Sequence, residues 1–269
     1  MIKLIAIDLD GTLLKSDKTI SQGNLEALRY ANQKGIKVVI CTGRPYFAMK
    51  QFIEEIGFTG PNDYIITFNG GQVRKAADGE ILVNNPLTQA DVQQWYAETE
   101  RLALPLNPID ENWVYEPMAY PEGRPSIYLD LGNNLPTQKV EFNDFDAEHV
   151  FNKCVICIEQ TYLDQQLEQL SPLFKANYSV VKSRPYLLEI MAKNVTKGRA
   201  LAQLGERLGI LPEEMMTMGD QENDLSMIEL AGVGVAMGNA IPMILEAADY
   251  VSAHNEADGV AQAIYHFIQ

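Results

Sequence analysis

A strand–helix–strand unit at the start of the chain is the feature that most restricts the fold. The apolar segment at residues 2–7 is short and runs directly into turn residues, which is typical of a strand buried on both faces of a parallel sheet. Ser21 is a good N-cap for a helix that ends at Gly35, and a second apolar segment, residues 36–40, follows at once. Two strands joined in this way form a right-handed βαβ unit. The sequence therefore predicts an α/β fold built on a parallel sheet.

The same alternation continues to residue 85 and resumes at residue 186. Pro45 can open a helix that runs to Ile56, and residues 64–68 give a third strand. In the later part we expect helices at residues 198–208, 223–231 and 258–267, a short helix opened by Pro242, and strands at 215–218, 233–236 and 250–251. Residues 1–85 and 186–269 together predict a discontinuous, Rossmann-like core.

Residues 86–185 have a different pattern, in which prolines cluster and strands occur without regular helical alternation. Thr88 with Asp91, and Thr161 with Asp164, resemble capping boxes that open two helices. Strands are expected at residues 126–131, 150–158 and 179–182. This segment is predicted to be an α+β cap domain inserted into the core.

Composition and charge exclude several classes of function. The chain has 269 residues, and 21 Lys and Arg against 36 Asp and Glu give a formal charge of −15. Such a surface repels phosphate backbones and anionic lipids, so we expect neither nucleic acid nor a membrane as a partner. No apolar stretch reaches the ~18 residues of a membrane span, and the first residues do not form a secretory signal. Three cysteines make no disulfide framework, which favours a reducing, cytoplasmic location.

Polar residues and glycines gather where the predicted core strands end. They occupy residues 8–12, 42–44, 69–71 and 219–224, and residues 196–198 precede the first helix after the insertion. Ligands of open parallel sheets bind beyond the carboxyl ends of the strands. We therefore expect these segments to converge at one edge of the sheet and to form the functional site.

Asp8, Asp10 and Asp220 are candidate metal ligands. Residues two apart in an extended chain point the same way, so the carboxylates of Asp8 and Asp10 would repel each other unless a cation lay between them. Mg²⁺ prefers a few carboxylates together with water and phosphate oxygens, and Asp224 repeats the acidic pattern. An ionised aspartate can also attack phosphorus and form an aspartyl-phosphate. The residues alone leave open which aspartate attacks, and ordinary turn residues are the alternative explanation.

Thr42 and Lys197 are candidate phosphate ligands, because phosphoryl oxygens need donors and positive charge. Backbone N–H groups near Gly43 and Leu9 can add donors without side-chain bulk. The alternative for Lys197 is a solvated lysine at the start of a helix, where its charge opposes the helix dipole.

Arg44 and Asn69 each allow two interpretations. Arg44 can contact the substrate or the cap, or it can be a surface residue beside Pro45. Asn69 can orient a neighbouring carboxylate, or it can serve only as a turn residue before two glycines.

Three other patterns are better explained by packing than by function. Cys154 and Cys157 match C-x-x-C, but residues three apart on a strand face opposite sides and no second pair exists. The glycines of residues 232–238 lack the G-x-G-x-x-G spacing of a dinucleotide site. The three histidines are scattered and form no ligand pattern.

Four segments, in this order, resemble the motifs of the haloacid dehalogenase-like (HAD) superfamily. They are residues 8–12 (DLDGT), residues 42–44 (TGR), Lys197 and residues 219–224 (GDQEND). The long insertion between the second and third motifs resembles the cap of the Cof-type branch, and within it the chain is similar to the YidA-like sugar phosphatases. This resemblance implies that the cap sets substrate specificity.

The resemblance also implies a role for each residue. Asp8 would be the nucleophile, and Asp10 the general acid for the leaving alcohol and later the base for water. Mg²⁺ would be held by Asp8, the backbone carbonyl of Asp10 and Asp220, with Asp224 in support. The phosphate would contact Leu9, Thr42, Gly43, Lys197 and Asn223.

We therefore expect a cytoplasmic, Mg²⁺-dependent phosphatase that hydrolyses small phosphorylated metabolites, foremost sugar phosphates, through an aspartyl-phosphate. The alternatives are a phosphomutase on the same scaffold, a phosphatase for flavin mononucleotide or pyridoxal phosphate, and a non-catalytic sensor of phosphorylated ligands. Residues near Glu116 and Tyr186 are candidates for the contribution of the cap to specificity. The sequence carries no signal for an oligomeric state.

Overall fold

The computed structural model describes residues 1–131 and 135–268, and the chain divides into two compact units. The core unit comprises Met1–Gly43, Met49–Val83 and the chain from Thr196 onward. The cap unit comprises Arg44–Ala48 and Asn84–Val195. In the described part of the chain, no helix is both long and apolar enough to cross a membrane.

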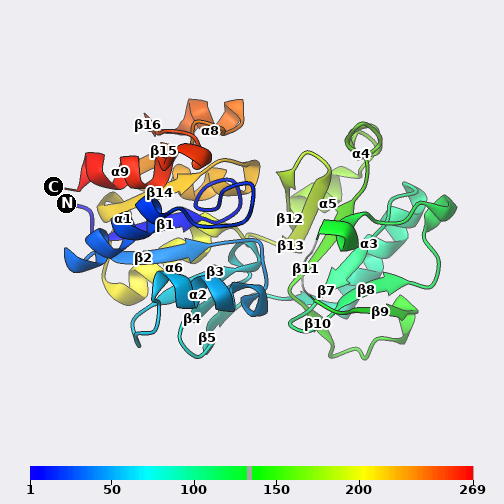
Figure 1. Ribbon diagram of the computed structural model, residues 1–269. Coiled ribbons are helices and arrows are strands. Elements are labelled where there is room, and N and C mark those ends of the chain that lie inside the picture. Colours follow the sequence, from blue (N-terminus) through cyan, green and yellow to red (C-terminus); the bar gives the residue numbers. More distant parts are fainter. Residues whose placement is uncertain (132–134, 269) are drawn as a thin grey trace. The chain divides into compact units, whose positions relative to one another are not determined.

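The core unit is built on one eight-stranded sheet (Figure 1). In spatial order its strands are β16 (Tyr250–Val251), β15 (Val233–Ala236), β14 (Met215–Gly219), β1 (Leu4–Asp8), β2 (Lys37–Cys41), β3 (Tyr64–Thr67), β4 (Gln72–Lys75) and β5 (Ile81–Asn84). From β16 to β3 all neighbours are parallel, and β4 pairs antiparallel with β3. The predicted α/β class with a parallel-sheet core is therefore confirmed. The β4–β5 extension was not predicted, because its four-residue strands lie between turn residues without a helical crossover.

The core helices are α1 (Gln22–Gln33), α2 (Lys50–Ile56), α6 (Lys197–Leu208), α7 (Leu225–Ile228), α8 (Pro242–Ala247) and α9 (Gly259–Phe267). On one face of the sheet, Leu4 and Ala6 of β1 pack in one cluster with Leu201 of α6 and Met227 of α7. Alternate residues of a strand point to the other face, where α1 packs against α9 (Figure 1). Ser21 is the N-cap of α1, as predicted, and its Oγ accepts from the N–H of Asn24 at 3.1 Å.

Short 3₁₀ turns modify two of the predicted helices. The segment after Pro45 forms η1 (Tyr46–Met49) and then α2, and the predicted helix at 223–231 is divided into η7 (Glu222–Asp224) and α7. The remaining turns are η2 (Phe68–Gly70), η6 (Pro212–Glu214) and η8 (Asn255–Ala257) in the core and η3 (Pro121–Gly123), η4 (Tyr128–Leu131) and η5 (Phe142–Asp144) in the cap.

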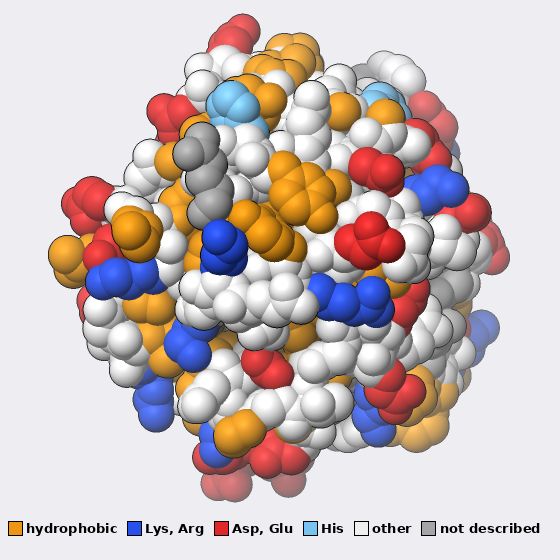
Figure 2. Space-filling model, turned by 60° about the vertical axis from the view of Figure 1, so that its left-hand side comes forward, with side chains coloured by type: hydrophobic (Ala, Val, Ile, Leu, Met, Phe, Trp, Pro, Cys, Tyr) orange, Lys and Arg blue, Asp and Glu red, His pale blue; other side chains and the backbone are white. Residues whose placement is uncertain are grey.

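Most acidic residues lie on the surface. On the face shown in Figure 2, Asp and Glu side chains are interspersed with Lys and Arg and do not gather in one patch. Among the described residues the buried acids are Asp8, Glu98, Glu189, Asp220 and Asp224. Glu98 and Glu189 have cationic partners within the cap, whereas the other three belong to the core.

The cap unit has a six-stranded sheet in the order β12 (Tyr178–Arg184), β13 (Leu187–Ala192), β11 (Lys153–Cys157), β7 (Asn107–Ile109), β8 (Val114–Pro117) and β9 (Thr137–Val140). A separate pair joins β6 (Leu87–Thr88) to β10 (Val150–Phe151), and the helices are α3 (Gln89–Arg101), α4 (Gln160–Leu167) and α5 (Pro172–Asn177). The predicted domain boundary at residues 185 and 186 is wrong. β13 pairs antiparallel with both β11 and β12, so the cap continues to Val195.

Local predictions in the cap had mixed outcomes. Thr88 and Asp91 form the predicted capping box of α3. The second predicted box is wrong, because Glu159 is the N-cap of α4 and its carboxylate accepts from the N–H groups of Thr161 and Tyr162. Residues 126–131 contain η4 in place of a strand, since the Oγ of Ser126 accepts from the N–H of Tyr128 and starts a turn.

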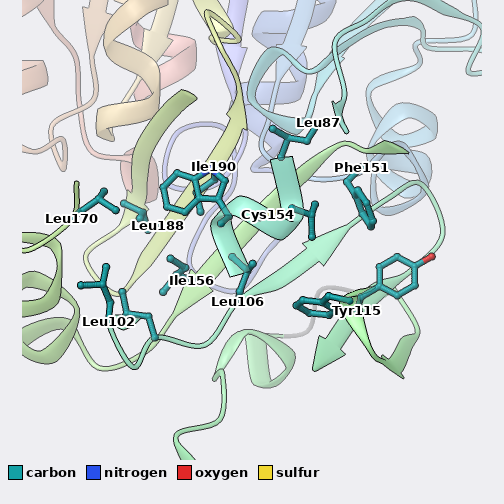
Figure 3. Packing of buried hydrophobic residues seen from close by; sticks show 14 of the residues in the cluster. Leu87, Leu102, Leu106, Tyr115, Phe151, Cys154, Ile156, Leu170, Leu188 and Ile190 are labelled. Atoms are coloured by element: carbon teal, nitrogen blue, oxygen red, sulfur yellow. The ribbon is translucent and has the colours of Figure 1, made fainter. Parts of the chain in front are cut away.

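The predicted strand at 150–158 is interrupted at Asn152, and its two parts pair with different partners. Cys154 of β11 packs in the hydrophobic cluster of the cap with Ile156, Leu188 and Ile190 (Figure 3). All three cysteines of the chain are free and buried. The C-x-x-C spacing therefore belongs to a packed strand, as predicted.

Lys153 of β11 and Glu189 of β13 form an ion pair inside the cap unit. The Nζ–Oε2 distance is 2.5 Å, and both side chains are 3% exposed. Burial disfavours the charged lysine, but Glu189 and Tyr128 outweigh this cost and raise the pKa of Lys153. Removing one partner of such a pair leaves a buried charge without compensation.

We predict that Glu189→Leu lowers the free energy of unfolding of the cap by about 3–5 kcal/mol, because it strands the Lys153 ammonium. The double variant Lys153→Met with Glu189→Leu should recover most of this loss. Both tryptophans, Trp95 and Trp113, lie in the cap, so their fluorescence during urea unfolding measures its stability. A single variant as stable as wild type would contradict the assignment of this pair as a buried, charged one.

Candidate active site

The order of the strands places the site at the centre of the core sheet. β1 lies between β2 and β14, so the crossover from β1 and the connections beyond β14 lead in opposite directions. Crevices for ligands open at such a change of direction, beyond the carboxyl ends of the strands. Asp8 is the last residue of β1, and Asp220 directly follows β14. Two of the predicted site residues therefore flank this point.

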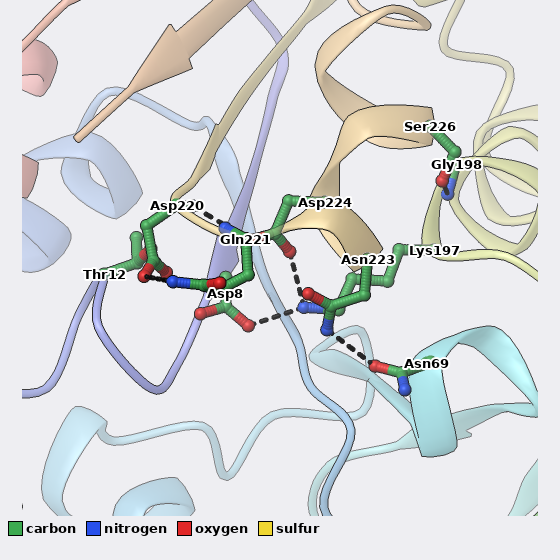
Figure 4. A network of polar contacts seen from close by, with 10 residues as sticks. All are labelled: Asp8, Thr12, Asn69, Lys197, Gly198, Asp220, Gln221, Asn223, Asp224 and Ser226. Carbon is green, nitrogen blue, oxygen red and sulfur yellow. Dashed lines mark hydrogen bonds and ion pairs between the residues drawn. The ribbon is translucent and has the colours of Figure 1, made fainter. Parts of the chain in front are cut away.

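Lys197 is fully buried and lies between two carboxylates. Its Nζ donates to Oδ1 of Asp8 at 2.5 Å and to Oδ1 of Asp224 at 2.6 Å (Figure 4). Burial disfavours the ammonium form, but Asp224 and Asp8 outweigh this cost and raise the pKa of Lys197. Lys197 is therefore a permanent positive charge inside the site and not a solvated lysine.

Asp220 completes a group of three buried carboxylates. One carboxylate oxygen from each of Asp8, Asp220 and Asp224 lies within 4.8 Å of the other two, which makes this group able to hold a metal ion. Asp220 accepts from Thr12 Oγ1 at 3.0 Å and from Gln221 Nε2 at 3.2 Å. Burial, and then repulsion from Asp224, raises the pKa of Asp220 to about 7. Burial also raises the pKa of Asp8, with Asp224 and Asp220 adding to the effect.

Asp224 shapes the loop that carries Asp220. Its Oδ2 accepts from the backbone N–H groups of Asp220 at 2.9 Å and of Gln221 at 3.0 Å, while its Oδ1 accepts from Lys197. Both oxygens of Asp224 are thus engaged. This carboxylate fixes the turn after β14 and orients the lysine at the same time.

A close approach of α6 and α7 holds Lys197 in place. A Cβ at Gly198 would lie 2.1 Å from the carbonyl oxygen of Ser226, so only glycine fits there. The N–H of Gly198 donates to Ser226 Oγ at 3.0 Å, and Thr196 caps the helix by accepting from the N–H of Arg199. The start of α6 is therefore fixed against the segment that follows Asp224.

Asn223 and Asn69 meet beside this group. Asn223 Nδ2 donates to Asn69 Oδ1 at 3.0 Å (Figure 4). Asn69 has a φ of 55°. The Nδ2 of Asn69 and the Oδ1 of Asn223 are both buried, and neither has a hydrogen-bond partner among the described residues. Both expectations for Asn69 were incomplete, since it sits in a turn and orients an amide, not a carboxylate. A buried donor and a buried acceptor remain available to a polar ligand.

Asp10 does not join the three carboxylates. β1 ends at Asp8, the chain turns, and Asp10 Oδ1 accepts from Lys18 Nζ at 2.7 Å. β1 ends two residues before Asp10, so the extended spacing on which the expected pairing of the Asp8 and Asp10 carboxylates rested does not apply there. In the group that could hold a metal, the carboxylate of Asp224 takes the place expected for that of Asp10.

The second motif is divided between the units. Thr42 is buried, its N–H donates to Ile66 O at 2.8 Å, and its carbonyl accepts from the N–H of Asn69 at 2.9 Å. Thr42 and Gly43 thus belong to the core, at the end of β2, whereas Arg44 belongs to the cap unit. Leu9 is buried and accepts from the N–H of Leu14 at 2.9 Å.

Sequence reasoning missed several residues of this network. Thr12 stood inside a recognised motif, and its hydroxyl could have been matched to the carboxylates expected nearby. Gln221 also stood inside a recognised motif, whereas Lys18 and Ser226 carried no such signal, because each acts through a contact that only the folded chain creates.

The chain matches the profile of the family described as haloacid dehalogenase-like hydrolase over residues 5–264. It belongs to this family. The 5-amino-6-(5-phospho-D-ribitylamino)uracil phosphatase YcsE of Bacillus subtilis (strain 168) is 34% identical over 268 residues, which cover 99% of this chain and 96% of that protein.

Two solved structures agree with this assignment. A haloacid dehalogenase-like hydrolase from Bacteroides thetaiotaomicron is 31% identical, has a TM-score of 0.83, and is covered over 100% of both chains. The HAD subclass IIB sugar phosphatase BT4131 is 27% identical, with a TM-score of 0.79 and coverage of 98% of each chain. The resemblance on the four motifs is therefore confirmed at the level of the family.

Gly11 lies in the first motif of this hydrolase and close to Asp220 of the fourth. Its φ is +89°, and a Cβ there would lie 2.4 Å from Oδ2 of Asp220. A side chain at this position would strain the loop and displace the Asp220 carboxylate.

We predict that Gly11→Ala lowers hydrolytic turnover by about 100-fold, as expected when catalytic groups are displaced by about 1 Å. The matched control is Gly35→Ala, where φ is +78° but, apart from its neighbours in the chain, no atom of the described residues lies within 4 Å of the added Cβ. Both variants carry the strain of a positive φ, but only the first reaches the site. Equal turnover in the two variants, measured on a reactive phosphate ester, would show that the contact with Asp220 has no catalytic consequence.

Proposed function

We propose that the protein is a Mg²⁺-dependent phosphatase that hydrolyses small phosphorylated metabolites, foremost phosphorylated sugars and polyols. The observation that carries the proposal is that Lys197 is buried between Asp8 and Asp224 and that Asp220 lies close to both acids. This group lies next to β1, on whose two sides the strand order runs in opposite directions. A carboxylate nucleophile, a cation for phosphoryl oxygens and a set of oxygen ligands thus stand together.

The donor set fits Mg²⁺. Three carboxylates face one lysine, so the ionised group has two negative charges without a partner, and buried charges of this kind are costly. Mg²⁺ prefers hard oxygen ligands and keeps several waters. Asp8 and Asp220 would hold the ion together with the backbone carbonyl of Asp10, while Asp224 would support them because its two oxygens are already engaged. When bound, the ion would neutralise charge that develops on the phosphoryl oxygens.

We assign Asp8 as the nucleophile that would attack phosphorus. One of its oxygens accepts from Lys197, and among the described residues no donor contacts the other. In the first step this free oxygen would form a bond to phosphorus while the bond from phosphorus to the substrate oxygen breaks. The aspartyl-phosphate would then be attacked by water, which releases inorganic phosphate and restores Asp8. Lys197 would stabilise the transferred phosphoryl group in both steps.

Asp10 would donate a proton to the leaving alcohol and take one from the attacking water. Its Oδ1 accepts from Lys18 Nζ at 2.7 Å. Thr42, Gly43, Leu9 and Asn223 would hold the phosphate, and we assign Arg44 to the substrate or the cap.

Substrate class and location follow from charge, cysteine chemistry and the relatives. The −15 charge disfavours nucleic acid and membrane lipids, and a small phosphate ester avoids most of this repulsion. One relative is named for a phosphorylated ribityl compound and a structural neighbour for sugar phosphates, which supports a polyhydroxylated substrate. Three free cysteines support a reducing, cytoplasmic location.

We predict that Asp8→Asn lowers phosphate release by about 10⁴-fold or more, because an amide cannot form the acyl-phosphate. Asp17→Asn is the matched control, since Asp17 lies in the loop that follows β1 but its side chain is 60% exposed. The assay is a phosphate-release screen over sugar phosphates, flavin mononucleotide, pyridoxal phosphate and nucleotides, with Asp8→Asn as the blank. Full turnover by Asp8→Asn would overturn the assignment of Asp8 as the nucleophile. An isomerised sugar phosphate without net phosphate would identify a mutase.

We also predict that a chelator such as EDTA lowers turnover by about 100-fold or more and that added Mg²⁺ restores it, because a bound cation contributes several kcal/mol at the transition state. Mg²⁺ should raise the unfolding temperature as well, since it binds the folded state. Undiminished phosphate release by the metal-free protein would rule out the proposed metal dependence.

A further inference from the structure

We propose that Asn239 is a positioning residue that sets the spacing between the two loops that carry the metal-binding carboxylates. This inference rests on the proposed function, because it concerns the same Mg²⁺ site. Asn239 lies in residues 237–241, the segment between β15 and α8, and no signal in the sequence pointed to a role for Asn239. We call this segment the bridging segment.

The side chain of Asn239 holds the loop after β1. Its Nδ2 donates to the carbonyl oxygen of Gly11 at 2.8 Å, and its Oδ1 accepts from the backbone N–H of Asn255 at 3.0 Å. Both partners are backbone groups of fixed polarity, so the orientation of the amide is unambiguous. Gly11 is next to Asp10, whose carbonyl is assigned to the metal, and three residues after Asp8.

The backbone of the same segment holds the loop after β14. The N–H of Met237 donates to Gly219 O at 3.1 Å, and the N–H of Ile241 donates to Asp220 O at 3.0 Å. Asn239 stands between these two donors in the chain. The bridging segment therefore binds the carbonyls that flank the Asp220 carboxylate and, through one side chain, the carbonyl beside Asp10.

Two further asparagines hold the loop that follows β1. Asn255 Nδ2 donates to Leu14 O at 2.8 Å, and Asn24 Nδ2 contacts Leu13 O at 3.5 Å while its Oδ1 accepts from the N–H of Ala261. Both asparagines are buried. They hold the later part of the loop, whereas Asn239 holds the part next to the candidate ligands.

Through these contacts Asn239 would influence the affinity of the site for Mg²⁺. A Mg²⁺ site demands near-ideal octahedral geometry, so its affinity depends on the separation of its protein oxygens. The Thr12–Asp220 hydrogen bond also joins the two loops, but it contacts the Asp220 carboxylate itself. Residues that orient metal ligands without touching the metal change affinity by roughly 10–100-fold when substituted.

The test is isothermal titration of Mg²⁺ into metal-free wild type, Asn239→Asp and Asn239→Ser, with the unfolding temperature of each metal-free protein recorded. The Asp variant keeps an acceptor for the N–H of Asn255 but places a carboxylate oxygen against Gly11 O. Its added negative charge would by itself strengthen Mg²⁺ binding. We expect the Kd to rise by about 10-fold or more in both variants, which loss of positioning explains and added charge does not.

Ser252→Ala is the control. Ser252 is buried in the core unit, and its Oγ donates to Gly259 O at 2.6 Å, so the variant also loses a buried side-chain-to-backbone hydrogen bond. It should lower the unfolding temperature and leave the Kd for Mg²⁺ unchanged. If folded Asn239→Ser binds Mg²⁺ with wild-type affinity, or if Ser252→Ala loses as much Mg²⁺ affinity as the Asn239 variants, the role of Asn239 is overturned and the proposed function is not. A wild type that neither binds Mg²⁺ nor releases phosphate would overturn the proposed function and this inference with it.

Discussion

Lys197 has no contact with solvent, and much of the core unit is arranged to surround it with compensating charge. A buried ammonium is tolerated only where carboxylates and good hydrogen-bond geometry replace water. Asp8 comes from the end of β1 and Asp224 from the turn after β14, so the parallel pairing of these strands is what brings both acids to the lysine. The glycine that follows the lysine lets α6 approach α7 closely enough to complete the arrangement. The strand order and the packing of α6 on α7 are therefore both needed to bring the carboxylates to the buried lysine.

This arrangement also places several buried carboxylates together, which lowers the stability of the folded state. Asp8, Asp220 and Asp224 are all buried, and burial raises the pKa of Asp8 and Asp220. A protein selected for stability alone would replace such a cluster with apolar side chains. The surface acids carry no comparable cost, because water solvates them. The net charge of −15 therefore has two physically different components, surface carboxylates that water solvates and the buried carboxylates of a group that could hold a metal ion.

Much of the core could be predicted from sequence, because its signals are local and consistent. Apolar strands separated by capped helices predicted β1, β2, β3, β14 and β15. The polar residues at the ends of the first and fourth of these strands include Asp8 and Asp220, and Lys197, at the start of α6, contacts Asp8. The cap was harder, since its pairings join distant segments. The residues of β13 do not by themselves indicate that this strand pairs with β11 and β12. The predicted boundary between cap and core was therefore placed one strand too early. The periodicity of the sequence also did not show that β1 stops at Asp8, two residues before Asp10.

The position of the cap within the chain has a consequence for how the molecule is made. Hydrogen bonds of the site join residues 189 and 208 positions apart, from Asp8 to Lys197 and from Thr12 to Asp220. During synthesis β1, β2 and β3 therefore emerge well before β14, the neighbour that covers the other edge of β1. The whole cap, with its own hydrophobic cluster, is complete in the interval and can fold as a unit. Until β14 is synthesised, one edge of the apolar strand β1 has no neighbour, and until Lys197 is synthesised Asp8 lacks its partner. The incomplete core is therefore the species in most need of protection from aggregation.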